Sequence, residues 1–148
     1  MNIVIIGSGG REHALCYKLL KSSKINKIYC IPGNAGTDEI ATNIFADIND
    51  FDEIYKIVLK LNVELIVVGP EIPLVNGIVD YFEKKNIKIF GPNKKCSQLE
   101  GSKFFMKNIC KKYNIPSAKY FEISDINQIE KFLSSVSFPV VVKSDGLA

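Results

Sequence analysis

A glycine-rich turn near the N-terminus constrains the fold more than any other stretch of this sequence. Four apolar residues at positions 3–6 lead directly into Gly7-Ser8-Gly9-Gly10, and a helix is expected over residues 11–20. A short run without polar residues is typical of a strand buried on both faces of a parallel sheet. Glycine lets the chain turn sharply and approach a ligand closely. We therefore predict a first strand–helix unit with a phosphate or other small-anion site at the helix N-terminus.

The turn departs from the dinucleotide-binding fingerprint at two points. Glu12 stands where that fingerprint has its third glycine. The strand expected over residues 27–31 ends Cys30-Ile31-Pro32, without the acidic residue that holds a ribose in that fold. An NAD-dependent oxidoreductase is therefore disfavoured, and tight NAD binding would revive that alternative.

Strand and helix patterns alternate along the first 92 residues. Apolar runs at residues 27–31, 65–68 and 87–90 predict three further strands, and amphipathic patterns predict helices at residues 49–61 and from Pro73 onward. This alternation predicts an α/β fold with a doubly wound parallel sheet. Ligands bind outside the carboxyl ends of the strands in such sheets. The loops that begin at Gly7, Pro32 and Gly69 leave from that edge, so we expect them to form one site.

The pattern changes at Gly91-Pro92-Asn93. Residues 94–99 suit a connecting turn or short helix, residues 102–113 and 125–135 suit helices, and residues 118–123 suit a strand. Residues 139–143 predict a buried strand that ends at Lys143. We therefore expect one domain over residues 1–92 and the incomplete beginning of a second over residues 93–148.

Composition and charge exclude several classes of protein. The 148 residues are 47% apolar and 24% charged, as in ordinary soluble domains. No apolar run approaches the roughly 18–20 residues that span a bilayer, and the first is too short for a signal peptide, so a cytoplasmic protein is expected. The net charge is +3, with the basic excess after Asn93. That excess could favour polyphosphate, but it is too scattered to indicate nucleic-acid binding.

The cysteines do not predict a metal site. Cys16, Cys30, Cys96 and Cys110 form no CxxC pair, and His13 is the single histidine of the sequence. We therefore expect reduced cysteines that serve in packing, without a zinc site or a disulfide framework.

Six stretches in a fixed order resemble one enzyme family. They are GSGGREHA, PGNAGT, VVGPEIPLVNGIVD, KIFGP, QLEGSKFFMK and FPVVVKSDGLA. Together they resemble the phosphoribosylamine–glycine ligases of the ATP-grasp superfamily, over residues 2–148. The resemblance implies a Rossmann-like pre-ATP-grasp domain up to about Pro92, followed by the opening of an α+β ATP-grasp module.

The resemblance also implies a reaction and its ligands. The family joins glycine to 5-phosphoribosylamine with ATP, by way of glycyl phosphate, and releases glycinamide ribonucleotide, ADP and phosphate in purine synthesis. Lys103 and Lys143 match its ATP contacts. The substrate-side positions are Gly7, Gly9, Gly10, Gly33, Asn34, Gly36, Thr37 and Glu71. Arg11, Glu12 and His13 are expected to hold the turn and first helix, which leaves binding to backbone N–H groups.

Two features of the resemblance limit what is expected of this chain. The sequence ends where the family continues into a glycine-rich phosphate-covering segment, and the ligands for Mg²⁺ or Mn²⁺ are expected further downstream. No glycine-dependent ATPase is therefore expected of these 148 residues alone. Small molecules are the expected partners, and a monomer is favoured. The alternatives are another ATP-grasp enzyme, of formyltransferase or carboxylase type, and a non-catalytic phosphosugar- or nucleotide-binding module.

Overall fold

The computed structural model describes residues 1–147, which divide into two compact units, Met1–Ser97 and the described residues from Gln98 onward. Ala148, which belongs to the expected second domain and to the last family stretch, lies outside the described residues. The strands are β1 Asn2–Gly7, β2 Lys27–Pro32, β3 Thr42–Asn43, β4 Val63–Val68 and β5 Ile89–Phe90. The helices are α1 Gly10–Leu19, α2 Ala35–Asp38, α3 Phe51–Lys60, α4 Glu71–Asn76, α5 Ile78–Glu83, α6 Lys94–Gly101, α7 Lys103–Lys112 and α8 Gln128–Leu133.

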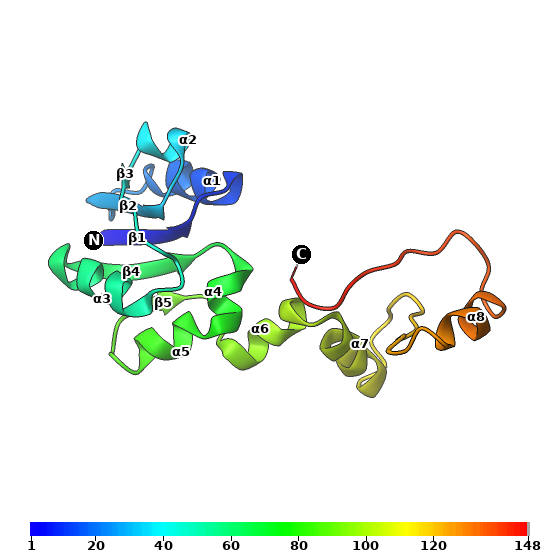
Figure 1. The fold of residues 1–148 in the computed structure, drawn as a ribbon. Helices are drawn as coiled ribbons and strands as arrows, with labels where there is room; N and C mark the ends of the chain where they lie inside the picture. Colours follow the sequence, from blue (N-terminus) through cyan, green and yellow to red (C-terminus); the bar gives the residue numbers. More distant parts are fainter. Residues whose placement is uncertain (148) are drawn as a thin grey trace. The chain divides into compact units, whose positions relative to one another are not determined.

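The strands of the first unit form a single parallel sheet in the order β3-β2-β1-β4-β5 (Figure 1). β1 is the middle strand, and it pairs along its length with β2 on one side and β4 on the other. The register places Gly7 opposite Pro32 and Ile6 opposite Val68. The carboxyl ends of the three central strands are therefore level, as the predicted fold requires.

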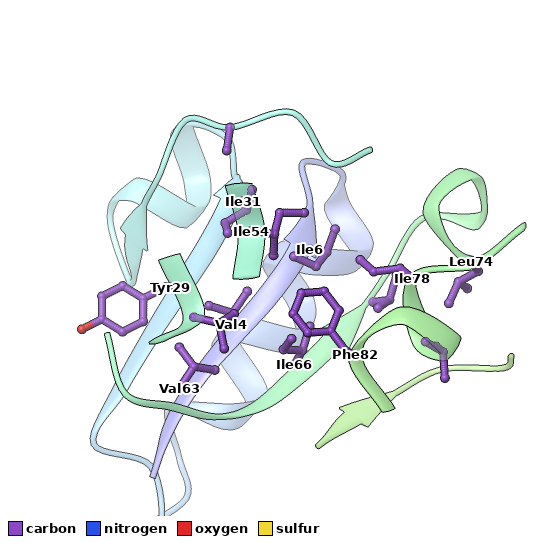
Figure 2. Packing of buried hydrophobic residues seen from close by; sticks show 14 residues of the cluster. Val4, Ile6, Tyr29, Ile31, Ile54, Val63, Ile66, Leu74, Ile78 and Phe82 are labelled. Atoms are coloured by element: carbon purple, nitrogen blue, oxygen red, sulfur yellow. The ribbon is translucent and has the colours of Figure 1, made fainter. Parts of the chain in front are cut away.

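The two faces of the sheet are covered by different helices. Val4 and Ile6 pack on one face against α3 and α5, and Figure 2 shows Ile6 and Ile66 beside the Phe82 ring. Ile3 and Ile5 pack on the other face, against Cys16 of α1. Because successive residues of a strand point to opposite faces, this alternation buries β1 on both sides. The doubly wound sheet predicted from the sequence is confirmed.

Three local features of the first unit differ from the predictions. The helix expected from Pro73 onward is divided into α4 and α5 at Gly77, which has a left-handed φ of +98°. Asn34 caps the four-residue helix α2, where only a loop was expected. The strand β3 was not predicted, since two residues are too few to show a period.

The second unit contains helices but forms none of the strands expected in it. Residues 118–123 and 139–143 have no strand structure, and neither segment pairs with another strand among residues 1–147. Val141 and Val142 are 82% and 89% exposed, so the buried strand predicted at residues 139–143 is wrong for this structure. The buried hydrophobic side chains of residues 1–147 all lie between Ile3 and Phe82. The apolar run at residues 139–143 has no partner strand among residues 1–147, and the described residues from Gln98 onward form no hydrophobic core, so it is not held as a buried strand.

The cysteines that belong to the core of the first unit differ in burial from the other two. All four are free thiols; Cys16 and Cys30 are buried, as packing residues would be, whereas Cys96 is exposed and Cys110 is half-buried. No helix formed by residues 1–147 is long and apolar enough to cross a membrane.

Candidate functional site

Loops from three strands are joined by hydrogen bonds at the carboxyl edge of the sheet. The Gly33 N–H donates to the Gly7 carbonyl at 3.1 Å, and the Gly69 N–H donates to the Ile6 carbonyl at 3.0 Å. The Asn34 side-chain amide donates to the Ser8 carbonyl at 2.8 Å. The loops that follow β1, β2 and β4 therefore form one continuous rim. The expectation that they lie together is confirmed.

A hollow of about 330 Å³ opens at this rim. Its lining residues are Gly7, Ser8, Gly9, Gly10, Arg11, Glu12, Ile48, Pro70 and Glu71. The turn after β1 and the start of α1 form one wall, and the start of α4 contributes another part. The first N–H groups of a helix have no carbonyl partner inside the helix, so the N-terminus of α1 can receive an anion here.

Glu12 holds the glycine turn from within. Its side chain is only 4% exposed, and its Oε2 accepts a hydrogen bond from the Gly9 N–H at 2.6 Å. A Cβ added at Gly7 would lie 2.7 Å from the Glu12 Cδ, and one at Gly9 would lie 2.9 Å from Oε2. A Cβ at Gly69, on the neighbouring loop, would overlap Oε1. The glycines at these positions therefore make room for a carboxylate of the chain itself.

This contact refines the expected role of the backbone N–H groups. Glu12 does hold the turn, as the sequence predicted, but in doing so it occupies the Gly9 N–H. Gly10 differs, because a Cβ added there would have no atom within 4 Å. The open position in the turn is therefore Gly10, at the first residue of α1.

Arg11 joins the first loop to the third. Its Nη1 donates to the Gly69 carbonyl at 2.6 Å, and both of its terminal nitrogens lie 3.0 Å from Glu71 Oε1. The Glu71 backbone N–H, and after it the Arg11 guanidinium, hold the pKa of the Glu71 carboxyl below its usual value. Glu71 therefore stays ionised at the mouth of the hollow, where it can accept hydrogen bonds from a hydroxyl or pair with a cation.

The loop after β2 is fixed by its own side chains. Thr37 is fully buried, and its hydroxyl contacts the Asn34 backbone and Asn43 Oδ1 at 2.7–2.9 Å. Gly33 has a φ of +75°, and an added Cβ would overlap the Asn43 side chain. At Gly36 an added Cβ would lie 3.1 Å from the His13 ring. Thr37 thus shapes the loop from below, whereas Asn34 reaches the rim.

In the second unit, the segments that carry the two predicted ATP-binding lysines meet. Asp145 Oδ1 accepts a hydrogen bond from the Lys103 N–H at 2.6 Å, and Oδ2 accepts one from the Ser102 hydroxyl at 3.0 Å. The Lys103 ammonium donates to the Gly146 carbonyl. Desolvation tends to raise the pKa of Asp145, but these hydrogen bonds outweigh it and lower the pKa. Asp145 thereby ties the stretch around Lys143 to the N-terminus of α7.

Lys143 itself is exposed and follows a segment without strand structure. The prediction that a buried strand aims its ammonium at a fixed point is therefore wrong for this structure. Sequence reasoning also missed Ile48 of the hollow, Asn43 of β3, which bonds to the second loop, and Asp145. Of these, only Asp145 had a signal, because it stands within a stretch already singled out.

Family models match the entire chain. Residues 1–100 match the N domain of phosphoribosylglycinamide synthetase, and residues 101–148 match its ATP-grasp (A) domain. The chain belongs to the phosphoribosylglycinamide synthetase family. The family resemblance inferred from the sequence is thus confirmed.

Named relatives of the synthetase family agree over the same residues. The chain is 43% identical over 148 residues to the phosphoribosylamine–glycine ligase of Caldanaerobacter subterraneus, a match that covers 100% of this chain and 36% of the relative. It is 44% identical over 149 residues to a bifunctional purine biosynthetic protein of Dictyostelium discoideum, covering 99% of this chain and 18% of that protein. The chain thus spans about a third of the length of the single-function relative.

Solved structures reproduce the fold. The crystal structure of phosphoribosylamine–glycine ligase from Thermotoga maritima superposes with a TM-score of 0.72 at 31% identity, covering 99% of this chain and 34% of that one. The Staphylococcus aureus N5-carboxyaminoimidazole synthetase complexed with ADP gives a TM-score of 0.74 at 17% identity, covering 99% and 39%. The second likeness shows that the synthetase family shares its fold with another type of enzyme.

Proposed function

We propose that this chain supplies the phosphoribosylamine-binding end and part of the ATP-binding module of a phosphoribosylamine–glycine ligase. The ligase would couple ATP cleavage to the joining of glycine and 5-phosphoribosylamine, through glycyl phosphate, and would release glycinamide ribonucleotide, ADP and phosphate. The observation that carries the proposal is the hydrogen-bonded rim of three loops. The loops after β1 and β4, with Ile48, line a hollow of about 330 Å³, and the loop after β2 is hydrogen-bonded to the first of them. That volume is at the lower end of the range for small-molecule sites.

Each part of the rim has a chemical role in this proposal. The backbone of Gly7 and Gly10 faces the hollow, and the N-terminus of α1 would receive the substrate phosphate. The ionised Glu71 would bind a ribose hydroxyl or the amine. The sugar would be bordered by Gly33, Asn34 and Gly36, whose loop is supported by Thr37. The Gly9 N–H already donates to Glu12, so it would not bind the substrate.

The second unit supports the nucleotide side of the proposal. Phosphoryl transfer needs fixed cations, because negative charge moves onto phosphoryl oxygens in the transition state. Lys103 and Lys143 would supply two of them, with Asp145 joining their segments. Residues 1–147 contain no group of three or more His, Cys, Asp or Glu side chains placed to hold a metal ion. We therefore propose that the ligands for Mg²⁺ or Mn²⁺ come from other parts of the ligase.

Calorimetry with ribose 5-phosphate tests the substrate side directly. This compound keeps the sugar and phosphate of the proposed substrate and lacks its amine. Gly10→Leu would place a side chain in the open space at the start of α1, so we expect binding to weaken by at least about tenfold, which is about 1.4 kcal/mol. Lys18→Leu, an exposed change in the last turn of the same helix, is the matched control and should bind normally. Equal affinity of the Gly10→Leu variant and the wild type would overturn the assignment.

Activity assays address the reaction. We expect no glycine-dependent ATP hydrolysis from the 148-residue chain, and measurable turnover would contradict this. A full-length ligase carrying this sequence should use glycine with phosphoribosylamine in preference to formate or bicarbonate. Glycine-independent turnover with formate or bicarbonate would instead favour another ATP-grasp activity. A cytoplasmic location and a monomeric state stay predictions.

A further inference from the structure

Two buried cysteines lie face to face beneath the rim of the first unit. Cys16 is on α1 and Cys30 is on β2, both side chains are 0% exposed, and their sulfur atoms are 3.1 Å apart. Both are free thiols, and the side chains packed around them include Ile3, Ile5 and Ile28. A disulfide bond has a sulfur–sulfur length of about 2.05 Å, so the two sulfurs need to approach by only about 1 Å.

The pair is coupled to residues that shape the site. Burial, and after it the contact with Cys16, raises the pKa of the Cys30 thiol to about 12, although the Thr37 side chain acts in the opposite direction. Burial also raises the pKa of Cys16, and the charge of Glu12 contributes to the shift at both sulfurs. The carboxylate that holds the first loop and the side chain that holds the second therefore both influence the pKa of the thiol pair.

We propose that Cys16 and Cys30 form a redox pair, which a low-molecular-weight disulfide converts into an intramolecular disulfide. This inference goes beyond the proposed function and does not depend on it. One cysteine, as thiolate, attacks the small disulfide and displaces one of its halves, which leaves a mixed disulfide. The other cysteine then displaces the second half. Two S–H bonds are lost and one protein S–S bond forms, while the oxidant is reduced to two small thiols that carry away the two protons.

The surroundings determine how this reaction proceeds. A thiol that is buried in apolar surroundings is a poor nucleophile, so the reaction is slow and requires a local opening of α1. Once the mixed disulfide forms, the second sulfur is already beside it, and ring closure outcompetes release. Cys96 and Cys110 offer a contrast, since Cys96 is exposed and Cys110 contacts the sulfur of Met106 at 3.6 Å. Oxidation would fix α1 to β2 directly beneath the loops that begin at Gly7 and Pro32.

The test uses a Cys96→Ser/Cys110→Ser background, in which Cys16 and Cys30 are the remaining thiols. The folded variant is incubated with glutathione disulfide and followed by mass spectrometry, thiol titration and thermal unfolding. We expect the loss of two hydrogen masses, a linked Cys16–Cys30 peptide after proteolysis, and a rise in Tm of at least about 5 °C that dithiothreitol reverses. A stable glutathione adduct, a covalent dimer, or Cys16 and Cys30 thiols that are still free once the reaction has reached equilibrium would each overturn the proposal.

Adding Cys30→Ser to the same background provides the second control. Circular dichroism first establishes that the variant is folded. Cys16 alone should then remain a thiol or retain glutathione, without a rise in Tm. A rise in Tm equal to that of the background protein would show that the stabilisation does not come from the Cys16–Cys30 bond, and it would also overturn the proposal.

Discussion

Replacing Glu12 with alanine should destabilise the first unit far more than a typical change in a first helical turn. The change removes a carboxylate that is 4% exposed and leaves the Gly9 N–H, now bonded at 2.6 Å, without its partner. A hydrogen bond to a charged group contributes about 1.5–3 kcal/mol. The carboxylate also interacts with the N-terminus of α1, for about 0.3–1 kcal/mol. Because these contributions overlap, we expect a loss of about 2.5 kcal/mol in the free energy of unfolding.

Urea denaturation followed by circular dichroism measures this loss, and the chain provides its own control. Glu53 occupies the third position of α3, as Glu12 does in α1, but its side chain is exposed. Glu53→Ala should change the free energy of unfolding by no more than about 0.5 kcal/mol. Glu12→Gln keeps the shape and an acceptor oxygen, so its loss should lie between the two. If Glu12→Ala costs no more than Glu53→Ala, the buried carboxylate does not hold the turn.

Other consequences concern the contacts of the rim and of the second unit. Gly69→Ala should lower the free energy of unfolding of the wild type by about 1–3 kcal/mol, because its Cβ would overlap the Glu12 carboxylate. The loss should be much smaller in a Glu12→Ala background, and equal losses in denaturation experiments would refute the contact. The pKa of Glu71 is lowered in the folded chain, so its stabilisation is present above its unfolded pKa and is lost as the pH falls through the folded pKa. Because Arg11 and Glu71 are partly exposed, Glu71→Gln should lower the free energy of unfolding by only about 0.5 kcal/mol at pH 7 and by nothing near pH 2. A difference between variant and wild type that persists at pH 2 in unfolding titrations would contradict this. Asp145→Asn should speed hydrogen exchange at the Lys103 amide, and unchanged exchange by NMR would argue against the Asp145–Lys103 hydrogen bond.

The sequence predicted the sheet well because periodicity reports burial directly. Residues 3–6 read as a strand buried on both faces, and they are at most 1% exposed. The same reasoning failed at residues 139–143, where an equally apolar run is exposed. A pattern shows that a segment can be buried, but its partner strand determines whether it is. Gly77 was similarly ambiguous, since a glycine within a helical pattern is compatible with continuation or with a break.

The candidate site was predictable in position but less so in detail. The parallel order of the strands correctly predicted that the loops after β1, β2 and β4 meet at one edge of the sheet, and that ligands bind there stays a prediction. The particular bonds could not be predicted, because they join residues far apart in the chain: Arg11 reaches Glu71 across 60 residues, and Asp145 reaches Lys103 across 42. Glu12 was recognised as a departure from the dinucleotide fingerprint. Its bond to the Gly9 N–H, which explains that departure, became visible only in three dimensions.

The buried carboxylate of Glu12 determines what could be transplanted between proteins. Its oxygens fill the volume that side chains at Gly7, Gly9 and Gly69 would otherwise take, so these four positions constrain one another. If the first loop alone were grafted into a related scaffold, the Glu12 carboxylate would contact the residue that follows the fourth strand of that scaffold, and any side chain there would clash with it. The smallest exchangeable piece is therefore discontinuous in sequence, and such positions should be substituted jointly in any library that aims to change the ligand.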